Sequence, residues 1–334
     1  MFTRLLQRIL LLVPTLLGAV TLVFLVAHVI PGGPARALLG EKATPERLKY
    51  VAEKYGWDDP LAVQYGRFLK NTFFRFNFGE SYFTGRTVSE EIREYFPATA
   101  ELALAAMLPA VLIGITLGVL ASLRPGGFFD VSCTGFSTVG VSIPVFFLGL
   151  LLLLTFRSFP MGGRLDITMD VEPITGLLIP DSILRGQWDA ASNAFRHLIL
   201  PALALSTIPL AIITRMTRSS MLDVLQHDFI RTARAKGIGP NRVILMHALP
   251  NAALPIITVI GLQFGYLLAG AVLTESVFDW PGLGTYLTDA VNNRDFNAIQ
   301  GSTIVIVFCF VLVNLLVDLT YLVFEPRLRK EGTN

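Results

Sequence analysis

The sequence predicts an all-α membrane protein that crosses the bilayer several times. Of its 334 residues, 53% are hydrophobic and only 16% are charged, whereas about 25% of the residues in a soluble globular protein are charged. The charges gather in short segments between long blocks that contain almost none. Blocks of about 20 apolar residues have the length that a helix needs to span a bilayer. This composition excludes a soluble enzyme, and a net charge of +2 gives no sign of nucleic-acid binding.

Six apolar blocks predict six transmembrane helices. The first block resembles a secretory signal peptide, because Arg4 and Arg8 precede it. A signal peptide has an apolar core of only about 7–15 residues, so we predict an uncleaved span. The blocks lie at about 9–30, 99–122, 131–156, 198–217, 252–274 and 301–324.

The placement of lysine and arginine predicts the orientation. The segment 215–250 has six of these cations against two aspartates, and 275–300 has four acidic residues against one arginine. An excess of lysine and arginine marks the cytoplasmic side. We therefore predict that both termini and the loop 218–250 are cytoplasmic, and that segments 31–98, 158–197 and 275–300 face outward. The predicted units are residues 1–30 with the first span, an outer domain 31–98, a core 99–324 and a tail 325–334.

The outer segment 31–98 is predicted to form a small helical domain. Thr44 is a typical N-cap for a helix that opens at Pro45 and stops at Gly56. Asp59-Pro60 opens a second helix. Thr87 and Glu90 match a capping box for a third helix, which we expect to end near Pro97. No catalytic constellation is evident in this domain.

The cytoplasmic loop has a helical pattern from Arg218 to Lys236. Met221, Leu225 and Phe229 recur every four residues, which predicts one apolar face. The polar side chains of the loop are placed on the opposite face. These are Asp223, His227, Arg231 and Arg234.

Gly237 is predicted to end this helix in the left-handed conformation. Gly239-Pro240 then starts a second helix, which runs to about Ala248 before Leu249-Pro250 turns the chain into the next span. A loop that served membrane insertion alone would require cations but not this pattern of two capped helices. The pattern therefore favours a rigid element that contacts a soluble partner.

This loop resembles the cytoplasmic loop of binding-protein-dependent ABC importers. That family has Glu-Ala-Ala, three residues, Gly, nine residues and Ile-x-Leu-Pro. When the pattern is aligned on Gly237, Ala233, Leu249 and Pro250 match it. Other residues replace the Glu, the first Ala and the Ile, and these departures look like the variant found in dipeptide and oligopeptide permeases. They are Arg231, Thr232 and His247.

The resemblance covers about residues 1–330. Pro173-Ile-Thr-Gly176 looks most like dipeptide members and a related branch linked to antimicrobial-peptide uptake. Pro31–Pro34 is similar to the branch but has Gly33 where Asp is common. Further matching motifs are Phe78–Ser81, Pro97–Glu101, Ser142–Pro144, Met216–Met221 and Trp280–Gly284.

The resemblance implies a type I ABC importer permease in a bacterial inner membrane. Its implied partners are a second homologous permease, two ATPase subunits and a periplasmic or lipid-anchored substrate-binding protein. The implied cargo is peptide, with dipeptides favoured. The loop would be the coupling helix that docks on an ATPase subunit. Its implied contact residues are Asp228, Arg231, Thr232, Ala233, Arg234, Ala235, Lys236, Gly237, Leu249 and Pro250.

The sequence contains no Gly-Lys dipeptide and hence no P-loop of the form Gly-x4-Gly-Lys-Ser/Thr. We therefore expect no cofactor in this chain, and expect ATP and Mg²⁺ to be bound by the ATPase subunits. The four histidines show no metal-ligand spacing and are interpreted as structural or surface residues. They are His28, His197, His227 and His247.

Ionisable residues near membrane segments are candidate functional residues. Asp318 lies four residues after Asn314 in the last span, where we favour pairing within the bundle. Glu101 and Glu275 are expected at the wet membrane interface. In related permeases the loop after the fifth span dips toward the translocation path. The resemblance therefore adds residues of this loop to the two acidic candidates. The gate or path candidates are Glu275, Trp280, Pro281, Gly282, Gly284 and Asp318.

Two other classes remain alternatives. An ion-coupled secondary transporter would favour inverted repeats and midplane charges, and a membrane anchor would recruit a soluble enzyme without transport. The cargo also stays open among dipeptides, oligopeptides, haem, nickel complexes and antimicrobial peptides.

Overall fold

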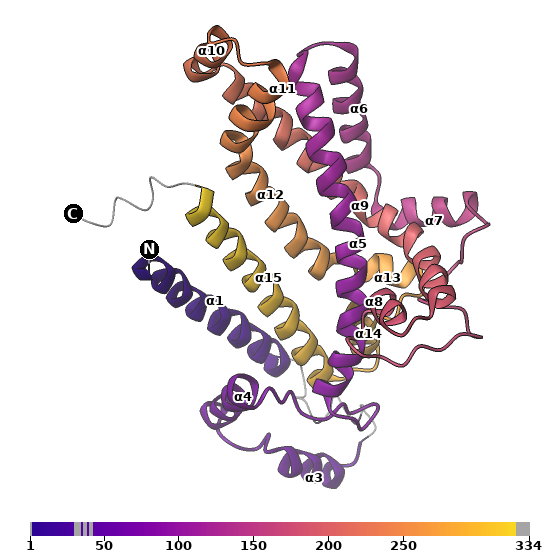
Figure 1. The fold of residues 1–334 in the computed structure, drawn as a ribbon. Helices are drawn as coiled ribbons and strands as arrows, with labels where there is room; N and C mark the ends of the chain where they lie inside the picture. The colour runs from indigo at the N-terminus through magenta and orange to yellow at the C-terminus, as the bar shows by residue number, and fades with distance from the viewer. Residues whose placement is uncertain (1, 30–34, 36–38, 40–42, 325–334) are drawn as a thin grey trace.

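The computed structural model describes residues 2–29, 35, 39 and 43–324, and the motif Pro31–Pro34 and the tail 325–334 lie outside them. Within the described residues every extended regular element is a helix, and one isolated bridge joins Glu80 to Thr87. The predicted all-α class is therefore confirmed (Figure 1). The helices are α1 Phe2–Val29, α3 Pro45–Tyr55, α4 Leu61–Arg75, α5 Val88–Leu123, α6 Phe128–Ser142, α7 Val145–Thr155, α8 Leu178–Leu184, α9 Trp188–Leu225, α10 Asp228–Ala235, α11 Pro240–Arg242, a π-helical turn Val243–Ala248, α12 Leu249–Gly270, α13 Val272–Val277, α14 Leu283–Asn292 and α15 Phe296–Phe324.

Four of the described helices are long and apolar enough to cross a membrane, and the pair α6 and α7 makes a fifth if it is counted as one span. The segment predicted as a span at 131–156 is broken into two helices, because α6 and α7 meet at an angle of 101°. Ile143 is extended at the break, with φ −84° and ψ 123°. Pro144 disfavours helical backbone at the residue before it, which explains the position of the break.

Two helix pairs approach closely through glycine. A Cβ added at Gly118 of α5 would stand 2.5 Å from the Cβ of Thr217 in α9. In the same way, a Cβ at Gly261 of α12 would overlap Val317 of α15. Small residues four apart allow membrane helices to pack backbone against backbone. Gly114 precedes Gly118 by four residues and also faces α9, so these seams fix α5 on α9 and α12 on α15.

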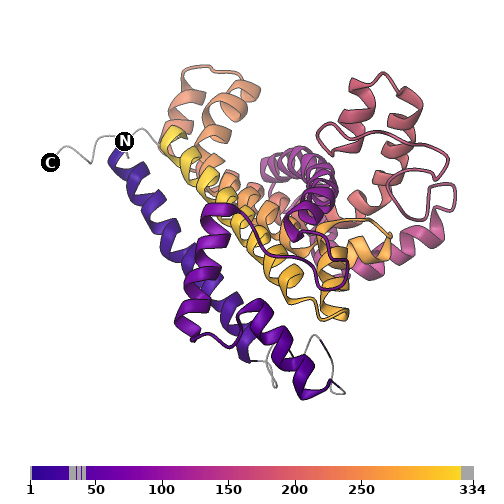
Figure 2. The ribbon, with the colours of Figure 1, turned by 90° about the horizontal axis from the view of Figure 1, so that it is seen from below.

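The bundle has two distinct ends (Figure 1). The α10 end carries α10 and α11, and the α14 end carries α3, α4, α8 and α14. Helices α1 and α15 run antiparallel along one side, so the start of α1 and the end of α15 lie beside each other. Figure 2, seen from below, places α3 and α4 beside α1 at the edge of the bundle.

The predicted helix starts in 31–98 are confirmed, but one predicted stop is wrong. The Thr44 side chain accepts a hydrogen bond from the Arg47 N–H, and Gly56 ends α3 at φ +67°. Thr87 caps α5 by accepting from the Glu90 N–H. That helix does not end near Pro97, because it continues for 26 more residues to Leu123. Its extensive packing against α9 outweighs the roughly 3 kcal/mol that an interior proline costs a helix.

Candidate functional site

At the α10 end, two buried side chains hold the short helix α10 against the rest of the bundle. Ile230 is fully buried and Ala233 is 8% exposed. Both pack into a cluster that contains Met221 of α9 and Ala252 of α12. Helix α10 is therefore packed against two long helices and is not a loose loop. A displacement of α10 has to move α9 and α12 as well.

The predicted continuous helix over 218–236 is wrong, and the predicted apolar face is correct for Met221 and Leu225 but wrong for Phe229. Helix α9 ends at Leu225, and α10 begins at Asp228 after a break at residues 226 and 227. The break rotates α10, so Ile230 faces the core while Phe229 is 43% exposed. The periodicity of Met221, Leu225 and Phe229 could not reveal this, because the pattern assumes an unbroken helix.

The glycine elbow is confirmed. Gly237 has φ +77°, and its N–H donates to the Arg234 carbonyl at 2.9 Å. No atom lies within 4 Å of a Cβ built at Gly237, so backbone conformation rather than space requires glycine there. Pro240 opens α11 at its first position, as predicted.

The predicted turn at Leu249-Pro250 is wrong. The π-helical turn Val243–Ala248 leads directly into α12, which begins at Leu249. Pro250 sits in the first turn of α12, where no intrahelical bond needs its missing N–H. Leu249 packs against the same cluster as Ala233, whereas Pro250 is exposed.

The remaining predicted residues of the loop are exposed and include three basic side chains against one acidic side chain. The Arg231 and Asp228 side chains approach at 3.4 Å while 76% and 93% exposed. Such exposed pairs contribute little to stability, so these charges are accessible to a second protein. The exposed set is Asp228, Arg231, Thr232, Arg234, Ala235, Lys236 and Gly237.

A second site lies at the α14 end around the buried carboxylate of Glu275. Its side chain is fully buried and accepts hydrogen bonds from the Thr99 hydroxyl at 2.6 Å and the Thr285 N–H at 2.9 Å. Burial raises the pKa of Glu275, and the hydrogen bonds from Thr99, Thr285 and Gly284 oppose that rise. The expectation that Glu275 sits at a wet interface is wrong, since tertiary packing excludes water from it.

Glu275 explains two glycines of the Trp280–Gly284 motif. A Cβ at Gly282 would overlap the carboxylate, and one at Gly284 would stand 2.7 Å from its Oε2. Gly282 is also the N-cap of α14 and has no side chain to cap the helix. Glu275 supplies the missing oxygen, at the helix end where an anion is favoured.

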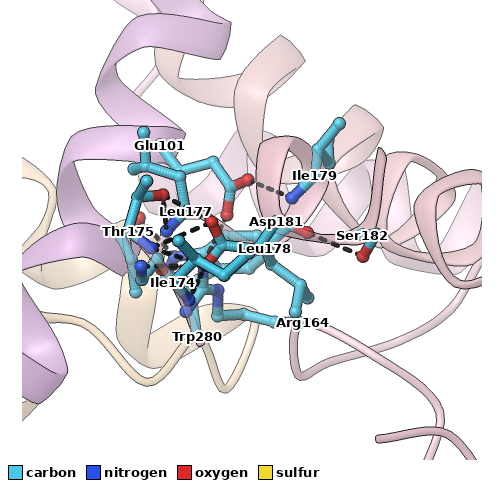
Figure 3. Close-up of polar contacts among 12 residues, drawn as sticks. Glu101, Arg164, Ile174, Thr175, Leu177, Leu178, Ile179, Asp181, Ser182 and Trp280 are labelled. Carbon is cyan, nitrogen blue, oxygen red and sulfur yellow. Dashed lines mark hydrogen bonds and ion pairs between the residues drawn. The ribbon is translucent and has the colours of Figure 1, made fainter. Parts of the chain in front are cut away.

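Trp280 connects this site to Arg164 and Glu101 (Figure 3). The indole is 1% exposed, and its N–H donates to the Ala98 carbonyl at 2.9 Å. The Arg164 guanidinium lies 5.7 Å from the ring centroid, a cation–π contact. Arg164 Nη2 also donates to Glu101 Oε2 at 2.5 Å and to the Gly176 carbonyl at 3.1 Å.

Glu101, like Glu275, is buried and not at the predicted wet interface. It is 7% exposed, and its second oxygen accepts the Ile179 N–H at 2.8 Å. The sequence analysis missed Arg164, because no local pattern distinguishes it from any other loop arginine. Only the pairing with Glu101 and Trp280, both distant in the chain, identifies it.

Asp181 shapes the turn Pro173–Gly176 beside Arg164 (Figure 3). Its carboxylate accepts the N–H groups of Ile174, Thr175 and Gly176 at 2.9–3.1 Å. Although burial raises the pKa of Asp181, the Thr175 hydroxyl and these N–H groups outweigh it and hold the pKa below its ordinary value.

The structure brings four of the six gate candidates together and leaves two outside. Glu275, Trp280, Gly282 and Gly284 form the site above. Pro281 is exposed between them. Asp318 is half-buried on α15. It follows the start of α15 at Phe296 by 22 residues, which is roughly 33 Å along a helix.

A match to a known protein family identifies the family of the chain. The family model described as "Binding-protein-dependent transport system inner membrane component" matches residues 114–330. The chain belongs to this family. Its N-terminal companion model matches residues 1–103, so the two together cover both ends of the bundle.

Curated members of the family are similar over nearly the whole chain. The chain is 44% identical to "Di/tripeptide transport system permease protein DppB" of Pseudomonas aeruginosa (strain UCBPP-PA14) over 330 residues, 97% of this chain and 98% of that protein. It is 43% identical to "Dipeptide transport system permease protein DppB" of Alkalihalophilus pseudofirmus, with the same coverage of both chains, 97% and 98%. For the Escherichia coli (strain K12) protein of that name the identity is 43%, over 98% of this chain and 99% of that protein.

Membership confirms the resemblance drawn from the cytoplasmic loop. Proteins of this family are membrane components of ABC importers and are not themselves catalytic, since ATP-hydrolysing subunits drive the transport. The chain is thus a multi-pass permease subunit that works with ATPase and substrate-binding partners. The ion-coupled carrier and the non-transporting anchor do not account for the family match.

Proposed function

We propose that this chain is one permease subunit of an ABC importer that carries dipeptides and other short peptides across the bacterial inner membrane. The observation that carries this proposal is the 43–44% identity, over 97–98% of the chain, to permeases named for dipeptide or di/tripeptide transport. A second homologous permease completes the pathway. Two ATPase subunits bind ATP and Mg²⁺ at one end, and a periplasmic or lipid-anchored binding protein delivers peptide at the other.

The proposed topology has six spans with both termini in the cytoplasm. Helix α1, the first span in the chain, completes the six together with the five spans counted above. Its 28 residues are long enough to cross a bilayer. The basic α10 end faces the cytoplasm, in line with the excess of arginine and lysine there. The α14 end, with α3 and α4, then forms the outer face. We assign the domain 31–98 to docking of the partner permease or the binding protein.

The α10 end is proposed as the coupling element. Its exposed cationic face contacts an ATPase subunit, while Ile230 and Ala233 hold it on α9 and α12. A short helix fixed in this way transmits a rigid-body displacement to the spans. Movement of the ATPase subunit then shifts α9 and α12 together and exchanges inward-facing and outward-facing states.

The Glu275–Trp280 site is proposed as the outer gate. Its loop is fixed to the start of α5 by Thr99 and to segment 158–197 by Arg164. Support for a gate is that Trp280 joins the Ala98 carbonyl of α5 to Arg164 of segment 158–197, so a change at this site reaches both. Asp318 is proposed to belong to the translocation path rather than to the outer gate, at the contact of α15 with α12.

Reconstitution tests the function. The four-subunit transporter with its binding protein is placed in proteoliposomes, and uptake of labelled dipeptide, oligopeptide, haem and nickel chelate is measured. ATP-dependent dipeptide uptake that a protonophore leaves unchanged is the expected result. Uptake of haem or nickel chelate without dipeptide would refute the cargo. Deletion of residues 35–95 without loss of assembly or uptake would refute the docking role of that domain.

A further inference from the structure

One turn of α9, at the α10 end, contacts α5, α6 and α10. Thr217 is fully buried and lies against Gly118 of α5, within the seam described above. Met221 is fully buried in the cluster that also holds Ile230 of α10. Between these two residues, the Arg218 side chain reaches α6. This turn of α9 is therefore the place where the other helices of the α10 end are joined.

Arg218 is joined to α6 by a bidentate ion pair with Asp130. Its Nη2 donates to Asp130 Oδ2 at 2.7 Å, and its Nε donates to Oδ1. Asp130 is 3% exposed and also accepts the Gly126 N–H at 2.9 Å, which ties the loop between α5 and α6 to the same carboxylate. Two parallel N–H···O bonds fix the orientation of the two groups as well as their distance. The pair therefore holds the start of α6 in one position on α9.

The rest of the face that α6 turns toward α9 consists of small side chains. Apart from Asp130, the buried residues of α6 are Cys133, Ser137 and Gly140. Gly140 faces Thr207 of α9, since an added Cβ would stand 3.2 Å from the Thr207 Cγ2. None of these positions has a large apolar side chain that would interlock with α9. The position of α6 on α9 therefore depends strongly on the ion pair.

At its other end, α6 leads through α7 to the outer site. Helix α6 begins at the α10 end and continues through α7 toward α13 (Figure 1). A Cβ added at Gly149 of α7 would stand 3.0 Å from the Phe278 ring and 3.2 Å from Val277. Phe278 lies in the chain between Glu275 and Trp280. A displacement of α6 and α7 would therefore reach the proposed gate.

We propose that Asp130 and Arg218 are positioning residues that couple ATP hydrolysis to transport, an inference that rests on the proposed coupling role of α10. A displacement of α10 moves α9 through the cluster that contains Met221. The ion pair makes α6 move with α9 as one rigid body, and α6 carries the displacement through α7 to Phe278. Without the pair, α6 lags behind α9 and the gate receives only part of the displacement.

The number of peptides imported per ATP hydrolysed tests the proposal. The four-subunit transporter with its binding protein is reconstituted in proteoliposomes, and uptake of labelled dipeptide and hydrolysis of ATP are measured in the same sample. Asp130→Asn keeps the shape of the side chain and removes its charge. The ratio should fall roughly tenfold, while assembly and ATP hydrolysis stay near those of the parent protein. An unchanged ratio in the assembled complex would overturn the proposal.

Arg218→Gln and the double variant Asp130→Asn/Arg218→Gln complete a double-mutant cycle. If the two residues act as one contact, the double variant should lose no more of the ratio than Asp130→Asn alone. Additive losses would show that the residues act separately and would overturn the pair. The double variant leaves no buried charge without a partner, so it replaces a single variant that fails to assemble, and a normal ratio in it would also overturn the proposal.

Two further variants distinguish positioning from stability. Arg218→Lys keeps the charge on α9 and should recover part of the ratio that Arg218→Gln loses. Arg124→Gln is the matched control, because it removes an exposed cation from the loop between α5 and α6 and leaves the pair in place. Its ratio should equal that of the parent protein. A role in stability alone would lower uptake and hydrolysis together, which leaves the ratio unchanged.

Gly237→Leu in the elbow after α10 separates this inference from the proposed function. If Gly237→Leu lowers the ratio and Asp130→Asn does not, the coupling role of α10 stands and the ion pair is wrong. If neither substitution lowers the ratio, the proposed coupling role itself fails. If the proteoliposomes import a cargo other than dipeptide, the proposed cargo fails, and the same ratio measured with that cargo decides on the ion pair.

Discussion

The Thr99 hydroxyl donates a 2.6 Å hydrogen bond to the carboxylate of Glu275, 176 residues further along the chain. The same hydroxyl oxygen accepts the Leu283 N–H at 2.8 Å. These two bonds join the outer part of α5, the end of α13 and the start of α14. Segment 275–292 therefore cannot shift relative to α5 unless buried hydrogen bonds break, and this property makes the proposed gate testable.

Gly282→Ala should destabilise the α14 end. The added methyl overlaps the Glu275 carboxylate, and the backbone of Gly282, at φ −106° and ψ 178°, is itself compatible with alanine. Overpacking of this kind costs about 1–3 kcal/mol. Thermal unfolding of the purified complex is the measurement. Gly66→Ala in α4 is the matched control, since its added methyl meets open space and alanine favours a helix.

Glu275→Gln should change the pH dependence of stability. Burial raises the pKa of Glu275 in the folded protein. Above about pH 4.3, the carboxyl group is therefore protonated in a larger fraction of folded molecules than of unfolded ones. The stability from this group is fully present below the unfolded pKa and is lost as the pH rises through the folded pKa. Glutamine cannot titrate. As the pH is raised from about 4.3, the melting temperature should therefore fall less steeply in the variant than in the wild type, and parallel curves would contradict the assignment.

Ile230→Ala should release α10, whereas Phe229→Ala should not. Ile230 is fully buried and its truncation costs about 2–5 kcal/mol. Phe229 is 43% exposed, so its removal has a much smaller effect. Hydrogen exchange of residues 228–237 in the assembled complex is the readout. Faster exchange in Phe229→Ala than in Ile230→Ala would show that the face of α10 is assigned the wrong way round.

Gly237→Leu should leave membrane insertion intact and uncouple ATP hydrolysis from uptake. The left-handed backbone costs a side chain with a Cβ roughly 1–2 kcal/mol, while the space around it is open. In the proposed coupling role, the end of α10 would then have to reorient on the ATPase subunit. ATPase activity and peptide uptake are measured in parallel in proteoliposomes. Gly237→Asn is the matched control, because asparagine tolerates this conformation. Normal uptake by Gly237→Leu at normal membrane levels would count against coupling.

Features that depend on neighbouring residues in the chain were predictable. Hydrophobic length identified the long membrane helices α5, α9 and α15. The caps at Thr44 and Thr87 and the left-handed elbow at Gly237 follow from local hydrogen bonding and from the steric freedom of glycine. The resemblance of the cytoplasmic loop also led to the correct family.

Features that depend on contacts between distant parts of the chain were not predictable. Two prolines behave differently in the structure. Helix α5 continues through Pro97, where a predicted helix was expected to end, whereas α6 stops just before Pro144, inside a predicted span. Packing of α5 on α9 decides the first case, and no local pattern encodes it.

The sequence by itself determined the membrane class, the positions of the long helices and the family. Only the tertiary structure placed Glu275 and Glu101 out of water, joined Arg164 to Trp280 and turned Ile230 inward. The physical reason is that hydropathy and capping act within a few residues, whereas burial of a charge depends on partners supplied by remote segments. Thr99 and Arg164 are such partners, and they meet the candidate gate only after the bundle has formed.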